Sequence, residues 1–96
     1  MIRHTVTFTL IHSLGSAEEE DFLRAARVLQ EIPEVQRFEI RRQVSESSDF
    51  TFGISMEFED EEAYDAYSRH PDHVQFVESR WDSEVKDFLE LDFVAL

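Results

Sequence analysis

Apolar and polar residues alternate along three stretches of the chain, at residues 2–11, about 35–44 and about 50–58. The third stretch has the clearest pattern, with apolar side chains at every second position: Phe50, Phe52, Ile54, Met56 and Phe58. A period of two places successive side chains on opposite faces of an extended chain, so each stretch is predicted to be a β-strand. A fourth strand is predicted from the alternation of Leu89, Leu91, Phe93 and Ala95.

The segment after the first strand has the pattern of a helix. Ser16 and Glu19 form a capping box, in which the two side chains satisfy free amides at a helix start. An apolar stripe at helical spacing follows, made of Phe22, Ala25, Ala26 and Leu29. Pro33 is expected to end this helix, because the residue before a proline is pushed out of the helical region.

A second helical segment follows the third strand and is interrupted near its middle. Asp60 can cap its start, and the helix must stop near His70, because Pro71 follows. Proline is favoured at the first position of a helix, so a further helix is expected to begin at Pro71. Its apolar residues are Val74, Phe76, Val77 and Trp81.

The order of these elements predicts the fold class. Residues 1–96 are expected to form one α+β domain with a ferredoxin-like βαββαβ arrangement, in which an antiparallel sheet carries its helices on one face. The apolar face of the sheet is expected to pack on the helices. The opposite face is expected to be threonine-rich and charged, from Thr5, Thr7, Thr9, Glu39, Arg41 and Glu57.

Composition excludes several classes of function. The chain has 22 acidic and 9 basic residues and a formal net charge of −13, which argues against binding to nucleic acid. It has no cysteine, no signal-peptide pattern and no apolar run long enough to span a membrane. We therefore expect a soluble, cytoplasmic protein that does not act at a membrane.

The candidate chemistry lies in AYSRHPDHVQF, residues 66–76, and in the first strand. His70 and His73 flank the start of the helix at Pro71, and on one interpretation they only shape this corner. A zinc site is disfavoured, because these two histidines fall short of the three protein ligands of a catalytic zinc, and no metal is expected. Alternatively, an imidazole in an apolar pocket can transfer a proton near neutral pH, with the Tyr67 phenol as hydrogen-bond donor. His4, on the apolar face of the first strand, would need a polar partner.

These residues also carry a resemblance to a known family. The matching segments are Ile2-Arg3-His4, Phe38, the run from Phe58 to Ala63, Tyr67 with His70-Pro71-Asp72-His73 and Phe76-Val77, and Leu91-Asp92-Phe93. Together they resemble the stress-responsive dimeric α/β barrel (Dabb) family. The resemblance implies a ferredoxin-like monomer that pairs with a second copy, sheet to sheet, into a dimeric α/β barrel.

The resemblance also implies a site. A plant polyketide cyclase of this family works without a cofactor, and its catalytic residues match His73 as the base, Tyr67 as its helper and His4 in the first strand. A pocket between the sheet and the helices is implied. The residues expected to bind a ligand there are Val6, Phe8, Phe22, Leu23, His70, Phe76 and Val77.

Three functions remain open from the sequence. The first is a homodimer that binds a small, partly apolar molecule and performs acid–base chemistry without a cofactor. The second is a non-catalytic, stress-associated or accessory dimer with structural histidines. The third is a cofactor-free monooxygenase, because related barrels oxidise phenolic substrates. No sequence feature chooses a substrate.

Overall fold

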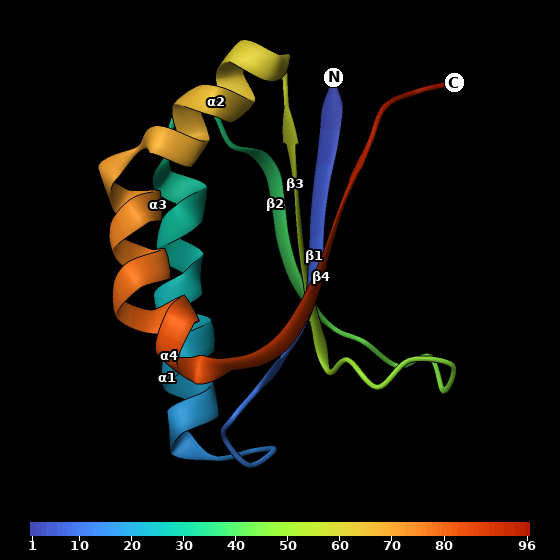
Figure 1. Cartoon of the computed structure of the whole chain (residues 1–96), viewed down its shortest axis with the longest axis vertical. Coiled ribbons are helices and arrows are strands. Elements are labelled where there is room, and N and C mark those ends of the chain that lie inside the picture. Colours follow the sequence, from blue (N-terminus) through green and yellow to red (C-terminus); the bar gives the residue numbers. More distant parts are fainter.

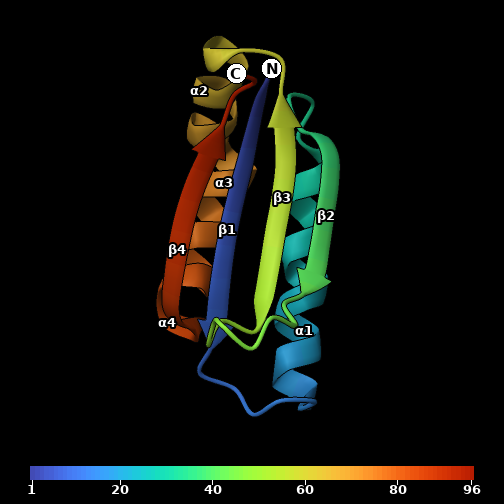
Figure 2. The same ribbon diagram turned by 90° about the vertical axis from the view of Figure 1, so that its right-hand side faces the viewer.

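The four strands form one antiparallel sheet. A computed structural model describes residues 1–96, with β1 at Ile2–Leu10, β2 at Gln36–Arg42, β3 at Phe52–Phe58 and β4 at Val85–Phe93. Their order across the sheet is β2-β3-β1-β4, so the N-terminal strand lies at the centre and the C-terminal strand at an edge (Figure 2). The predicted ferredoxin-like fold class is confirmed.

All helices cover the same face of this sheet (Figure 1). Helix α1 spans Ala17–Ala26 and continues as a 3-10 turn, η1, at Arg27–Glu31. After β3 come α2 at Glu61–Arg69 and α3 at Pro71–Phe76, followed by a π-helical turn, η2, at Val77–Trp81 and a last short turn, α4, at Asp82–Glu84. No helix combines the length and the apolar character needed to cross a membrane.

The predicted helix starts agree with the structure. The Ser16 hydroxyl accepts a hydrogen bond of 3.1 Å from the Glu19 amide, and the Asp60 carboxylate accepts one of 2.9 Å from the Ala63 amide. His70 caps α3, because its Nδ1 accepts a hydrogen bond of 3.1 Å from the Asp72 amide. These caps fix where α2 ends and α3 begins, and thereby where Tyr67 and His73 lie.

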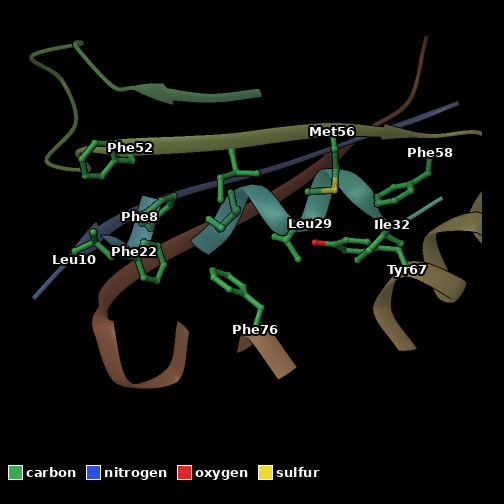
Figure 3. Close-up of a cluster of buried hydrophobic side chains, with 13 residues drawn as sticks. Phe8, Leu10, Phe22, Leu29, Ile32, Phe52, Met56, Phe58, Tyr67 and Phe76 are labelled. Atoms are coloured by element: carbon green, nitrogen blue, oxygen red, sulfur yellow. The ribbon is translucent and has the colours of Figure 1, made fainter. Parts of the chain in front are cut away.

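The hydrophobic core fills the space between the sheet and the helices (Figure 3). Phe8, Phe22 and Phe58 are completely buried. At one end of the core Phe8 packs on Phe22, with ring centroids 5.9 Å apart. At the other end Phe58 packs on Tyr67, with centroids 5.0 Å apart. The core therefore has two aromatic ends, and the candidate site lies between them.

The face of β4 that packs on the helices is not the predicted one. Leu91 pairs with Thr5 and Leu89 with Thr7, so both leucines lie on the helix-free face of the sheet. Leu89, Leu91 and Phe93 are 50%, 48% and 53% exposed. The strand also begins at Val85 and ends before Ala95. The residues expected on the helix-free face, such as Thr5, Arg41 and Glu57, do lie there, but an apolar stripe along β4 also crosses it.

Candidate functional site

A cavity of about 280 Å³ lies between the sheet and the helices. The sheet contributes apolar walls from three strands: Val6, Ile54, Met56 and Phe88. The helical layer contributes Leu29, Phe76, Val77 and Trp81. Because Phe88 and Glu90 on the edge strand are exposed, the cavity opens toward solvent on the β4 side.

Tyr67 brings a hydroxyl group into this cavity from α2. The residue is only 3% exposed, and its hydroxyl forms no hydrogen bond with another protein group. Figure 3 shows this oxygen directed toward the space between Leu29 and Phe76. Burial, followed by the charge of Glu90, raises the pKa of Tyr67 well above its ordinary value. The phenol therefore stays protonated and can donate a hydrogen bond to a bound molecule.

His73 lies beside Tyr67, with the two ring centroids 4.4 Å apart. Its Nδ1 is 3.0 Å from the Ser68 carbonyl oxygen. A carbonyl can only accept, so Nδ1 carries the proton and Nε2 keeps a free lone pair. Burial lowers the pKa of His73 below its ordinary value, an effect that the Ser68 carbonyl and Glu90 partly oppose and that His4 and His70 reinforce. At neutral pH this imidazole is therefore a neutral base.

His4 lines the cavity from β1 and is 6% exposed. Its Nδ1 lies 2.7 Å from Asp92 Oδ1 and 2.8 Å from the Tyr64 hydroxyl oxygen. The Tyr64 hydroxyl is also 3.0 Å from Asp92 Oδ2, to which it can donate. The carboxylate can accept from Nδ1–H, which fixes the orientation of the His4 ring. The polar partner that His4 needs is therefore Asp92, on the neighbouring strand.

The structure brings His4, Tyr67 and His73 to one cavity, together with three of the residues expected to line it, Val6, Phe76 and Val77. The other four lie elsewhere. Phe8 and Phe22 are in the core, and Leu23 packs against that core from α1. His70 caps α3, because Pro71 holds its backbone in an extended conformation at the helix start. The observed lining is therefore displaced toward β4 from the expected one.

Several site residues were not found from the sequence. Asp92 and Tyr64 hold His4, and Glu90, Trp81 and Asp82 line the cavity. Alternation alone predicts that Leu89 and Leu91 form the inner face of β4, and this places Glu90 and Asp92 on the wrong side of the sheet. The π-helical turn of η2 brings Val77 and Trp81, the first and last of its five residues, to the same cavity. The position of His4 on the apolar face of β1 could have indicated Asp92, because a buried histidine requires a carboxylate or carbonyl nearby.

His4, Glu90 and Asp92 are also the residues nearest to a metal-binding arrangement. One ligand atom from each lies within 4.8 Å of the others. However, His4 Nδ1 already contacts Asp92 and Tyr64, so a metal at that nitrogen would have to replace both contacts. One imidazole and two exposed carboxylates form a weak set of ligands. The expectation of no metal stays a prediction.

Replacing Asp92 by alanine is expected to lower the free energy of unfolding by about 1–3 kcal/mol, because the buried His4 ring loses its acceptor. Urea denaturation of the two proteins measures this difference. The matched control is Asp49→Ala, which removes an exposed carboxylate in the loop between β2 and β3. An equal effect of both substitutions would contradict the structural role given to Asp92.

The model of the stress-responsive A/B barrel domain family, Dabb, matches residues 2–95. This chain belongs to the Dabb family. No curated protein matches the sequence of this Dabb domain. A solved Dabb protein from Mesorhizobium loti with a ferredoxin-like fold is 53% identical to it, with a TM-score of 0.96 and coverage of 99% of this chain and 96% of the other.

More distant structures share the fold. A dimeric ferredoxin-like protein of unknown function from Thermobifida fusca is 21% identical, with a TM-score of 0.79 and coverage of 98% of this Dabb domain and 90% of that chain. A hydroxynitrile lyase from Passiflora edulis is 16% identical, with a TM-score of 0.84 and coverage of 99% and 93%. At these identities the likeness concerns the fold alone.

Proposed function

We propose that this Dabb domain binds a small, partly apolar molecule in the cavity and transfers a proton to or from it without a cofactor. His73 is the base and Tyr67 is the hydrogen-bond donor. The observation that carries the proposal is the convergence of His4, Tyr67 and His73 on one largely apolar cavity. Chemically useful groups rarely meet in this way without a role, because each unpaired polar group beside a core has a desolvation cost.

Each group has a defined part in the proposed chemistry. His73 Nε2 takes a proton from the substrate, because Nδ1 is already protonated and held by Ser68. The Tyr67 hydroxyl donates to the oxygen on which negative charge develops, and in an apolar cavity this stabilises the transition state strongly. The second ring nitrogen of His4, whose Nδ1 contacts Asp92, is a further polar group in the same space. The lyase from Passiflora edulis is an example of an enzyme on this fold.

A non-catalytic role is the second candidate, and a specific observation favours it. His70 caps a helix, His4 bonds Asp92 and His12 pairs with Glu84, so three of the four histidines have structural partners. This candidate leaves the free Tyr67 hydroxyl and the free nitrogens of His4 and His73 without a purpose. The assay described next separates the two functions.

The test uses 5-nitrobenzisoxazole, a neutral bicyclic compound that opens when a base removes its ring C–H proton. The C–H electrons form a nitrile, the N–O bond breaks, and the oxygen leaves as a coloured phenolate. We expect the protein to accelerate this reaction, with a rate that rises with pH and levels off once His73 is neutral. Because the pKa of His73 is lowered, the midpoint should lie below its ordinary value of about 6.5.

Absorbance at the phenolate wavelength, followed between about pH 4 and 9, gives this profile. The charges of His4, His70 and Glu90 also act on the pKa of His73 and therefore move the midpoint of the profile. The rate should still rise from low to high pH, because only the neutral form of His73 is a base. A rate no greater than that of free imidazole, or a midpoint well above 6.5, would count against His73 as the base.

We also propose that this Dabb domain forms a homodimer through the helix-free face of its sheet. Support comes from the exposed stripe of Leu89, Leu91 and Phe93, which has no apolar cover within the chain. In Figure 1 the segment between β2 and β3 and the C-terminal tail both project on this side of the sheet. A second copy packed on the same face would bury the stripe and give the barrel arrangement. Similar proteins are described as dimeric.

We further infer that the protein resides in the cytoplasm. The absence of cysteine fits a reducing compartment, where disulfides do not form. Fractionation of the source cells with an antibody against the protein would test this placement.

A further inference from the structure

The charged groups around the cavity are all acidic. Asp82 and Glu90 line it, and no lysine or arginine does. Asp92 lies behind His4, and its carboxylate, that of Glu90 and a ring nitrogen of His4 each lie within 4.8 Å of the other two. Two carboxylates at this separation repel each other, and the net charge of −13 adds to the negative potential.

Neither Glu90 nor Asp82, the two carboxylates that line the cavity, has a partner, and of the two only Glu90 acts through its charge on Tyr67 and His73. Glu57 pairs with Arg3 and Arg37. Glu84 pairs with Arg80 and His12. Glu90 forms neither an ion pair nor a hydrogen bond, although its charge is felt inside the cavity, where it raises the pKa of Tyr67. Its position at the opening leaves it free to meet a ligand.

The unpaired hydroxyl of Tyr67 independently points to a ligand. It belongs to a side chain that is 97% buried, and it faces the cavity without a protein partner (Figure 3). The lining of the cavity also includes the aromatic rings of Phe76, Trp81 and Phe88. Aromatic faces attract cations through their negative quadrupole, and more strongly where water is excluded.

We propose that the cavity selects small organic cations that consist of a single ring with an amidinium or ammonium group. Glu90 is the residue that sets this preference. The inference rests on the proposed function, because it concerns the ligand of the same site. A cation gains an ion pair with Glu90 and contacts with the aromatic walls. An anion of the same shape meets the two carboxylates and has no positive side chain in the lining. The cavity volume of about 280 Å³ lies just under the usual range for ligand pockets and suits one ring.

Three planar compounds of matched shape test the proposal: benzamidinium, benzamide and benzoate. Trp81 is the only tryptophan and lines the cavity, so its fluorescence reports occupancy directly. At pH 7.5 and low salt we expect affinity to fall in the order cation, neutral compound, anion. In Glu90→Gln the preference for benzamidinium over benzamide should fall roughly two- to fivefold, the effect of losing one solvent-exposed ion pair.

The matched control is Glu46→Gln, which removes one negative charge from the exposed loop between β2 and β3. It should leave the preference unchanged, whereas a fall equal to that in Glu90→Gln would assign the effect to net charge and overturn the proposal. Binding of benzoate as tight as that of benzamidinium would also overturn it, as would no binding of any of the three at millimolar concentration.

The ring-opening reaction separates this inference from the proposed function. Its substrate is neutral, so acceleration by His73 does not depend on the preference for cations. Acceleration without charge selection would refute the selectivity alone. Charge selection governed by Glu90 without acceleration would support the cation site and refute the proton transfer.

Discussion

Replacing His73 by glutamine is expected to lower the rate of 5-nitrobenzisoxazole opening by about 10²–10⁴-fold, the usual contribution of a positioned general base. Glutamine has a similar size, and its amide can still donate to the Ser68 carbonyl oxygen that now receives Nδ1–H. What it lacks is the basic Nε2. Stopped-flow or plate-reader absorbance at pH 7.5 measures the change, and thermal unfolding establishes that the variant is folded.

The control for this substitution is His12→Gln. His12 pairs with Glu84 outside the cavity, and the change should leave the rate as it is in the original protein. Tyr67→Phe removes only the hydroxyl donor and should reduce the rate less than His73→Gln does. If His73→Gln retained the original rate while His4→Gln lost it, the base would be His4, and the roles proposed here for the two imidazoles would be wrong.

Replacing Leu91 by glutamate is expected to convert the proposed dimer into a monomer. Leu91 is the middle residue of the exposed stripe on β4, and in a two-fold dimer each copy buries one such leucine. Burial of a leucine side chain contributes about 1.5–3 kcal/mol, so the loss from both copies weakens association by roughly 10²–10⁴-fold. The new carboxylates add repulsion between two chains that are already strongly acidic.

Light scattering coupled to gel filtration gives the mass directly, with 11.4 kDa expected for the variant and twice this value for the original chain. Leu14→Glu is the control, because it places the same charge at an exposed leucine in the loop between β1 and α1. A dimeric Leu91→Glu variant would show that the interface lies on another surface.

Local patterns were sufficient to predict most of the fold. The capping groups of Ser16 and Asp60 act on amides three residues away, and the structure contains both hydrogen bonds. Alternation in β1 and β3 identifies the inner face correctly, because these central strands have only one apolar face and the helices cover it. Such signals need no knowledge of distant parts of the chain.

The edge strand β4 shows where this reasoning fails. Its most regular apolar residues, Leu89 and Leu91, lie away from the helices, while Glu90 and Asp92 lie on the inner side. Alternation predicts that a strand has one apolar and one polar face, but it does not say which of the two faces packs on the helices. In this protein the helix-free face of the sheet is proposed to pack on a second copy. An apolar strand face can therefore pack either on the helices or on the partner. Asp92 would have been found by asking which strand supplies the acceptor for the buried His4.

The residues that line the cavity were also predicted only in part. His4, Tyr67 and His73 come from three different elements and reach one space, as their motif implied. Phe8 and Phe22 do not reach it, because a large ring at the centre of a sheet or on a helix facing it is drawn into close packing. Which side chains fill a core and which leave a hollow depends on three-dimensional packing, and the spacing along the chain does not contain that information.

A titration of the protein with benzamidine, followed by NMR through the side-chain nitrogen resonances of its four histidines, tests directly whether the cavity binds an organic cation. His4 and His73 line the cavity, whereas His12 and His70 lie outside it and serve as internal controls. We expect saturable shifts of the His4 and His73 resonances with a single dissociation constant, and unchanged resonances for the other two. Equal shifts of all four, or shifts of only His12 and His70, would contradict this expectation.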